Sequence, residues 1–434
     1  MRRSHHKRHP FHFRPIRDRT TMVRMAVTVL DRTPTGSIAR IAAGTPSYRR
    51  VVGLLAAGGL ANFAIIYFPQ PLLPAIAASF GVDAGVSGLA ISATTAAMLL
   101  GLLLSAPLSD RIGRVSAMSG SLVAAGVLSV ACAFAPTWEA FLALRAGGGL
   151  ALAVLPAVAL AYLRDAVRDD AHGRANALYI SGTALGGAVG RLAPLPLATL
   201  GGWQLVSIVL GALSVVVGVL VWFALPRDGA APLPLRIGDL LGGTVASLRH
   251  PVILAVCVAG ALAMATFVGL YNAVPFRLDG PAFSLGAAEV FVYFAYPLGI
   301  LAPGLFHRIS RRLSRAMTSL VGAIAMLAAI GLVFWPNVIA VFAGLGLLTA
   351  AFLGTHSILS GWVVARAQTV GRSTSRASSA YLLTYYLGST VSGAASTHLF
   401  ASAGWTAVVL LAAGLTTLCA ALFLTLRLRG SAGT

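Results

Sequence analysis

Two arginines that lie inside long apolar stretches are the residues of this chain most suited to chemistry. Arg145 and Arg191 fall within the stretches 138–163 and 174–199. A charge at membrane depth is costly unless it is paired or hydrated, so an intramembrane arginine points to a substrate or ion pathway. The helical rise places Arg145 roughly 10 Å from the outer end of its stretch and Arg191 roughly 25 Å from the cytoplasmic end. The alternatives are a side chain that reaches the outer interface for Arg145 and an outer-leaflet anchor for Arg191.

Groups that could carry a proton are scarce. Of the 12 acidic residues none lies deep in an apolar stretch, and Glu289 comes nearest, roughly 6 Å in from the outer end of 285–306. Proton-coupled carriers commonly use a membrane carboxylate, so coupling would depend on Glu289, on His356 or on a rearrangement around Arg145. An imidazole titrates near neutral pH, but His356 lies near the cytoplasmic end of its stretch, where a packed, hydrogen-bonded histidine is the alternative.

Polar, aromatic and small residues near mid-depth complete the candidate set. Possible cavity-lining side chains are Asn62, Tyr296 and Tyr385, and interhelical hydrogen bonding or packing is the alternative for each. Glycines at every fourth position, Gly182, Gly186 and Gly190, are expected to let two helices approach closely.

The elements that must position these residues are membrane-spanning helices. The chain is 57% hydrophobic and 10% charged, whereas soluble domains are about 25% charged. A span needs roughly 20 largely apolar residues. Such stretches fall at 51–80, 85–109, 115–135, 138–163, 174–199 and 203–225, and again at 251–276, 285–306, 316–336, 338–362, 377–401 and 405–426. We therefore predict an all-α integral membrane protein with twelve transmembrane helices.

The two sets of six repeat one another. Phe134-Ala135-Pro136 recurs as Phe334-Trp335-Pro336, and Gly202-Trp203 recurs as Gly404-Trp405. Further pairs at nearly constant offset are Arg174 with Arg376, Tyr179 with Tyr381, Gly186 with Gly388, and Arg111-Ile112 with Arg308-Ile309. The chain is thus predicted to form two pseudo-symmetric six-helix bundles, at 50–225 and 251–426. Two such halves can rock about a central site, which is a recurring plan of secondary transporters.

The net charge of +20 is a topology signal. Of the 32 Lys and Arg residues 12 lie in residues 1–50, 17 lie in loops or the tail on the same side, and Arg277 alone lies in an outer loop. This is the positive-inside asymmetry with both termini cytoplasmic, and it favours anionic lipid headgroups as a partner. Nucleic-acid binding is a poor second interpretation.

The segments outside the two bundles are short. Residues 1–49 are predicted to be a disordered basic cytoplasmic tail, with translation starting at Met22 or Met25 as the alternative. Residues 226–250 are predicted to be a cytoplasmic linker with a short interfacial helix, and residues 427–434 a second tail. The three cysteines fall in apolar spans, so no disulfide framework is expected, and neither a metal nor a cofactor is implied.

The loop after the second stretch carries the most specific motif, Ala106-Pro107-Leu108-Ser109-Asp110-Arg111-Ile112-Gly113-Arg114-Val115. Gly113 permits a tight turn, and Asp110 can make a contact with a helix N-terminus or an arginine that breaks when the halves move. The motif resembles the loop signature of the major facilitator superfamily, although Ala106 and Val115 replace its first glycine and last basic residue. The resemblance implies a conformational latch of Asp110, Arg111, Gly113 and Arg114. Arginines that face lipid headgroups are the alternative.

Two further matches point to the same superfamily. Arg145 followed by Gly149 resembles its second signature, which makes Arg145 a candidate participant in proton coupling. Gly182, Gly186 and Gly190 stand where its antiporters carry a glycine-rich signature, without the Gly-Pro of that signature.

A more specific resemblance covers residues 50–426 and is to the YnfM-like efflux transporters, of the drug:proton antiporter type. Its marks are Tyr67-x-x-Gln70-Pro71-x-x-Pro74, Pro156-Ala157-Val158-Ala159, Tyr179-Ile180-Ser181-Gly182 with Gly190-Arg191, Phe276-Arg277-Leu278, His356-Ser357 with Trp362-Val363, and Tyr385-Tyr386-Leu387-Gly388-Ser389.

The resemblance implies a monomeric secondary transporter of the bacterial cytoplasmic membrane, not an enzyme, that exports a small organic molecule against proton entry. Two membrane arginines without a deep carboxylate favour an uncharged or anionic substrate. Uptake or exchange of an anionic substrate is one alternative. A membrane sensor that has lost transport is another.

Overall fold

The computed structural model describes residues 40–227 and 237–431, which are largely helical. The first half comprises α2 (Pro46–Tyr67), η1 (Gln70–Leu72), α3 (Leu73–Phe80), α4 (Ala84–Ser87), α5 (Leu89–Ile112), α6 (Arg114–Cys132), α7 (Trp138–Leu152), α8 (Val154–Ala166), η2 (Asp169–Ala171), α9 (His172–Leu192) and α10 (Pro194–Ala224). The second comprises α11 (Ile237–Leu248), α12 (Pro251–Asp279), η3 (Gly286–Glu289), α13 (Val290–Tyr293), η4 (Tyr296–Leu301), α14 (Ala302–Ser310), α15 (Arg315–Phe334), α16 (Val338–Thr369) and α17 (Thr374–Ser431).

Twelve membrane crossings follow from these helices. Ten described helices are long and apolar enough to span a membrane. Helix α17 has 58 residues and turns at Gly404, so it makes two crossings. Helix α9 adds the twelfth with 21 residues, and its glycines and polar residues explain why hydropathy alone does not select it. The predicted twelve-helix class is confirmed.

The duplication is also visible in the backbone. Gly202 and Gly404, 202 residues apart, both adopt left-handed conformations, with φ of 67° and 76°. Each stands where a helix turns back, and each precedes a tryptophan. Helices α7 and α16 begin at caps 200 residues apart, Thr137 and Asn337, whose side chains accept hydrogen bonds from the first turn. Equivalent turns in the two halves therefore have equivalent geometry.

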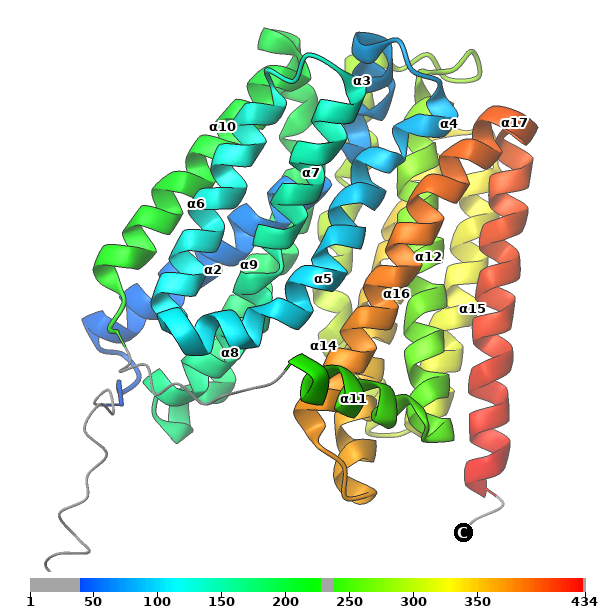
Figure 1. The fold of residues 1–434 in the computed structure, drawn as a ribbon. Helices are drawn as coiled ribbons and strands as arrows, with labels where there is room; N and C mark the ends of the chain where they lie inside the picture. The colour runs from blue at the N-terminus through cyan, green and yellow to red at the C-terminus, as the bar shows by residue number, and fades with distance from the viewer. Residues whose placement is uncertain (1–39, 228–236, 432–434) are drawn as a thin grey trace, which may run out of the picture. The chain divides into compact units, whose positions relative to one another are not determined.

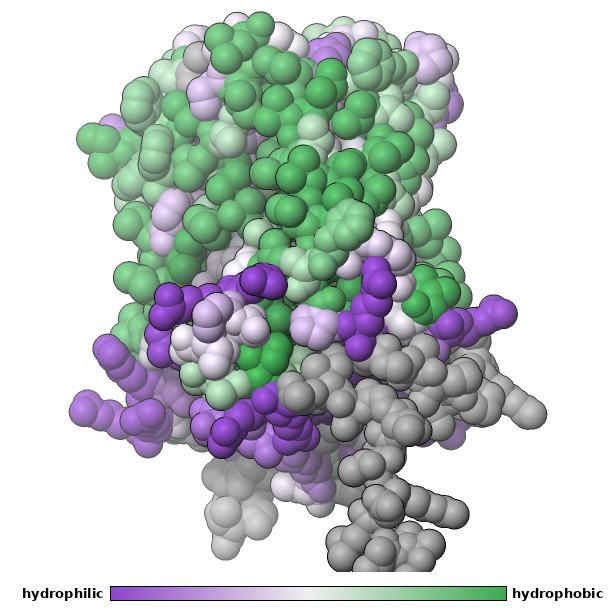
Figure 2. Space-filling model, turned by 90° about the vertical axis from the view of Figure 1, so that its left-hand side faces the viewer, coloured by the Kyte–Doolittle hydropathy of each residue, from purple (hydrophilic) through white to green (hydrophobic). Residues whose placement is uncertain are grey.

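The two ends of the bundle differ in chemistry. Figure 1 places the start of α2, helix α11 and the end of α17 at one end, the lower end in that view, which we call the tail side. Helices α3 and α4 lie at the other end, the far side. Figure 2 shows an apolar surface over most of the height and hydrophilic residues gathered at the lower end. Such a surface is what a bilayer requires of the lipid-facing residues.

Three predicted boundaries shift. The first helix begins at Pro46, because the Thr45 side chain caps it, and residues 40–45 join the folded part through hydrogen bonds of Ile41 with Ala166 and Arg168; the rest of the predicted tail, 1–39, lies outside the described residues. Within the linker 226–250, residues 228–236 are also outside, while α11 supplies the expected short helix. Helix α17 continues to Ser431, so residues 427–431 of the predicted second tail are helical, and its last residues, 432–434, lie outside the described part of the chain.

The glycines of α9 pack directly on α2. A Cβ atom added to Gly186 would lie closer than 3.0 Å to the backbone of Leu60. The same holds for Gly182 against Ala56 and for Gly190 against Ala64. Helix α9 therefore has one face on which only glycine fits, as in other close helix pairs in membranes.

We expect Gly186→Ala to destabilise the protein by at least about 1 kcal/mol, because the added methyl group forces α9 away from α2. Thermal unfolding in detergent measures the effect. Gly120→Ala in α6 is the matched control, since a Cβ there meets no atom within 4 Å. Equal melting temperatures of Gly186→Ala and the unchanged protein would contradict this prediction.

Candidate functional site

Arg145 lies inside the first half and is only 3% exposed. Its Nη1 donates to the carbonyl oxygen of Ile65 (3.0 Å) and its Nη2 to that of Ile66 (3.0 Å). Its Nε donates to the carbonyl oxygen of Ala90 in α5 (3.2 Å). All three nitrogens of the guanidinium therefore have backbone partners, and the side chain does not extend to the outer interface.

The sequence of the first span explains why Arg145 is needed there. Helix α2 ends at Tyr67, and Pro69 and Pro71 follow. Because proline has no N–H, Pro69 cannot donate to the carbonyl oxygen of Ile65 four residues earlier. A buried carbonyl group without a partner is costly in a membrane, and Arg145 supplies the missing donor. The arginine thus stabilises the break that separates α2 from α3.

Arg191 lies between the two halves and is 0% exposed. Its guanidinium carbon is 4.3 Å from the ring centre of Tyr67, in the first half. On the other side it is 4.8 Å from Tyr271 and 4.5 Å from Tyr296, and Phe267 lies at 5.6 Å. Aromatic faces attract a cation, so the two halves together form an aromatic cage around this charge.

The cage leaves most of the Arg191 donors unused. Nη1 donates to the carbonyl oxygen of Gly187 (2.8 Å). Nε and Nη2 are buried and have no hydrogen-bond partner within the described part of the chain. The Tyr296 hydroxyl is also near enough to interact with the guanidinium. Arg191 is therefore a buried cation that carries a free N–H edge.

Aromatic side chains continue from the cage toward His356. Phe267 stacks on Phe352 with ring centres 4.1 Å apart, and Phe352 is followed by His356 at 6.1 Å. The His356 Nδ1 atom hydrogen-bonds the Tyr381 hydroxyl (2.9 Å), and Tyr385 lies 4.7 Å from the imidazole. His356 was expected near the cytoplasmic end of its span, but α16 continues to Thr369 and places it near the middle.

Among the described residues, four hydrogen bonds join the halves on the far side. Gln70 Nε2 donates to Asn272 Oδ1 (2.7 Å), and these residues are 202 positions apart, the offset of the repeat. The other three come from α17 and the start of the second span: Ser92 to the carbonyl oxygen of Thr390 (2.7 Å), Thr95 with Thr390 through their hydroxyls (3.0 Å), and Thr397 to the carbonyl oxygen of Gly85 (3.1 Å).

The predicted latch loop lies on the tail side, at the junction of α5 and α6. Gly113 adopts a left-handed conformation, with φ of 84°, which fits the predicted tight turn. Arg114 forms an ion pair with Asp165 of α8, a contact within the first half that sequence reasoning missed. Asp110 is half-buried and Arg111 is exposed.

Glu289 and Asn62 are the remaining candidates. Glu289 ends η3 and is 4% exposed. Asn62 is buried in α2, and neither atom of its amide group has a partner among the described residues. The structure does not place either residue in the aromatic cage.

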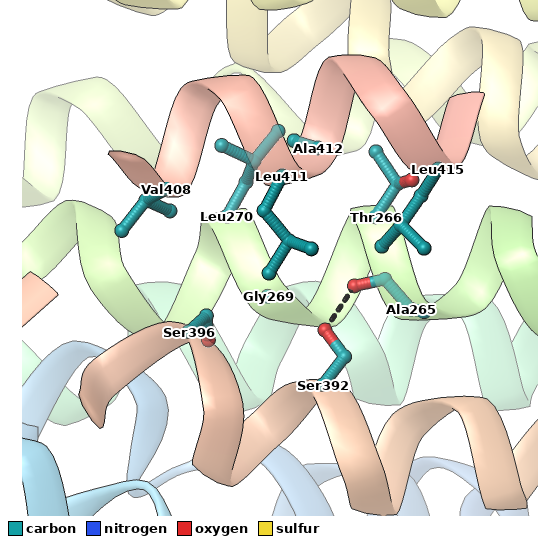
Figure 3. A pocket seen from close by; sticks show the side chains of 10 residues that line it. All are labelled: Ala265, Thr266, Gly269, Leu270, Ser392, Ser396, Val408, Leu411, Ala412 and Leu415. Carbon is teal, nitrogen blue, oxygen red and sulfur yellow. Dashed lines mark hydrogen bonds between the residues drawn. The ribbon is translucent and has the colours of Figure 1, made fainter. Parts of the chain in front are cut away.

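One small cavity of the second half lies where α12 packs against α17. Figure 3 shows α12 between the two arms of α17, where Ser392 donates to the carbonyl oxygen of Ala265. The cavity there measures about 10 Å³, which holds at most a single water. This cavity is therefore too small for a substrate. An adjoining apolar hollow of about 340 Å³ between α12 and α17 shares Ala265 and Ser392 with it.

Basic groups gather on the tail side where α11 meets α12 and α17. Arg372 donates to the carbonyl oxygen of Ala246 at the end of α11. Burial, and then the charges of Arg366 and Arg372, lower the pKa of His250. Protonation of this imidazole is thus disfavoured, and the arginines supply the positive charge of this corner.

Two six-helix halves that meet at a buried charge define a membrane transporter of the secondary type. The chain belongs to the Major Facilitator Superfamily, whose family model matches residues 55–374. It is 33% identical over 370 residues to the uncharacterized MFS-type transporter YybF of Bacillus subtilis (strain 168), covering 84% of this chain and 90% of that one. It is 30% identical over 367 residues to the inner membrane transport protein YnfM of Escherichia coli (strain K12), covering 84% and 87%. A bacterial homologue of the human lysosomal transporter Spinster has the same fold, with a TM-score of 0.70 at 15% identity over 88% of this chain and 97% of that one.

We expect Arg145→Met to lower the free energy of unfolding by at least about 2 kcal/mol, because it leaves the buried carbonyl groups of Ile65 and Ile66 without the donor that Arg145 supplies. The carbonyl oxygen of Ala90 keeps the Thr94 hydroxyl as a donor. Thermal unfolding in detergent measures the loss. Arg191→Met is the matched control: Arg191 is equally buried but makes one backbone hydrogen bond, so its removal should cost less. If the two variants had the same melting temperature, the proposed anchoring by Arg145 would be wrong.

Proposed function

We propose that this protein exports a small organic molecule by alternating access, driven by proton entry. The observation that carries the proposal is the set of four hydrogen bonds between the halves, which includes the Gln70–Asn272 pair. These bonds join the halves on one side of the bundle, and each is exchanged for other partners when the halves rock apart. The structure is then one end state of the cycle, with the far side sealed.

The orientation that we propose follows from charge. Arginines cluster at the tail side, so this side faces the cytoplasm and both termini lie there. The protein then resides in the bacterial cytoplasmic membrane as a monomer, with anionic lipids at its basic tail side. In the sealed state the substrate enters from the cytoplasm, as export requires. The latch of Asp110, Arg111, Gly113 and Arg114 acts on this side in the opposite state.

The substrate class that we propose is uncharged or anionic. Arg191 puts an uncompensated positive charge between the halves. Glu289 is the acidic residue that comes nearest to the interior of a span, and it is buried. A cation would meet repulsion at this interface. Uptake or exchange of an anionic substrate uses the same site, because gradients choose the direction of a reversible carrier.

The first experiment is transport of a panel of small organic compounds into inverted membrane vesicles with an imposed proton gradient. Accumulation that disappears when the gradient is collapsed supports coupled export. Selective transport of lipophilic cations that Glu289→Gln abolishes would overturn the proposed substrate class. A protein that moves nothing in the panel but retains a signalling phenotype would favour the sensor alternative.

A crosslink across the far side tests the rocking motion. We expect the double variant Thr95→Cys/Thr390→Cys to lose transport on oxidation, because a disulfide holds the halves together where the two hydroxyls are now 3.0 Å apart. A reductant should restore the rate, and each single variant should be insensitive. Full transport by a protein whose crosslink is shown complete by mass spectrometry would exclude rocking at this interface.

The role of Glu289 in coupling is tested separately. We expect Glu289→Gln to abolish accumulation driven by a proton gradient and to retain exchange of labelled for unlabelled substrate. An amide keeps the shape of the side chain but cannot carry a proton. Glu139→Gln, at the exposed start of α7, is the control and should leave both activities unchanged. Proton-driven accumulation that survives in Glu289→Gln would move the coupling role to His356 or Arg145.

A further inference from the structure

The free edge of Arg191 is the feature that we pursue. Nε and Nη2 lie on the same edge of the guanidinium plane, and their N–H bonds point in parallel directions. A carboxylate with its two oxygens matches this edge in a bidentate pair. The remaining nitrogen, Nη1, donates to the carbonyl oxygen of Gly187. A carboxylate that binds side-on to Nε and Nη2 does not need this donor.

Within residues 40–227 and 237–431, no group donates or accepts at this edge. The described residues place no acidic side chain in an ion pair with Arg191, and its Nε and Nη2 atoms are orphaned although both are buried. A buried charge without a partner is costly, and the cage of rings compensates only in part. The arrangement suits an anion that arrives and leaves.

The surroundings narrow the chemistry of that anion. The guanidinium lies among Tyr67, Tyr271 and Tyr296, and Phe267 continues into the stacked ring of Phe352. A planar ligand ring can stack on such surfaces. A strongly hydrated inorganic anion gains nothing from them. We propose that the Nε–Nη2 edge of Arg191 binds the carboxylate of an aromatic carboxylic acid, whose ring packs against these side chains.

The same geometry links binding to the transport cycle. Tyr67 belongs to the first half, whereas Tyr271 and Tyr296 belong to the second. The cage is therefore complete only when the halves are together, and their separation opens the free edge to water. The bound acid is the transported substrate only if the proposed transport function holds, and on that function this assignment rests. Binding itself can be measured without transport.

The test is equilibrium binding of radiolabelled benzoate to the full-length protein in lipid nanodiscs. Arg191→Gln should abolish saturable binding. Arg191→Lys should weaken it by about 10- to 100-fold, because lysine keeps the charge but lacks the bidentate edge. Unlabelled benzamide and chloride should fail to compete, and acetate should compete at least about tenfold more weakly than benzoate, since it lacks the ring.

Arg277→Gln is the matched control. Arg277 also stacks on an aromatic ring, that of Trp405 (4.5 Å), and has two unpartnered nitrogens. It lines a separate far-side pocket of about 560 Å³ within the second half. Its substitution should leave benzoate binding unchanged. Thermal unfolding shows whether each variant is folded. If Arg191→Gln does not fold, Arg191→Lys still tests the site.

The outcomes separate the two proposals. Unchanged benzoate binding in folded Arg191→Gln or Arg191→Lys, loss of binding in Arg277→Gln, or competition by benzamide or chloride as strong as by benzoate would each overturn the carboxylate site. Absence of saturable benzoate binding in the unchanged protein would overturn it as well. Arg191-dependent binding without any flux in vesicles would retain the site and reject the transport proposal.

Discussion

The need of every buried polar group for a partner inside the membrane governs this structure. The break after Tyr67 is the clearest case, because Pro69 has no N–H to donate to the carbonyl group of Ile65. Arg145 reaches from α7 to this carbonyl group, to that of Ile66 and to that of Ala90 in α5. The first, second and fourth spans are thereby joined at one point, and the broken first span can present Tyr67 and Gln70 to the other half.

The fold could be predicted from the sequence because hydropathy and repetition both act over long stretches. Apolar stretches located all twelve spans, including that of α9, whose glycines lower its apolar character, and the offset of 202 residues related the two halves. The repeat also paired Gly202 with Gly404, and the structure shows that both stand at turns. Boundaries were less accessible: a cap at Thr45 and the continuation of α16 to Thr369 are local features that hydropathy averages over.

The candidate site could be predicted only in part. A charge in an apolar stretch is conspicuous, so Arg191 was selected directly, and Tyr296 was selected for its depth. Tyr271 and Phe267 carry no signal of their own, because apolar and aromatic residues are ordinary in a span. Their importance depends on which helix faces which across the two halves. Gln70 and Asn272 were also missed as a pair, although the repeat offset between them could have revealed it.

The two buried arginines illustrate opposite solutions to the same physical problem. Arg145 has backbone partners for all three of its nitrogens, and those partners belong to the half in which it lies, so its environment persists when the halves move. Arg191 has one backbone partner and a cage built from both halves, so its environment changes with every movement between them. A charge can bias a conformational equilibrium only if its free energy differs between the two states. Arg145 is therefore suited to hold one half together, and Arg191 is suited to make the balance between the states depend on what occupies its free edge.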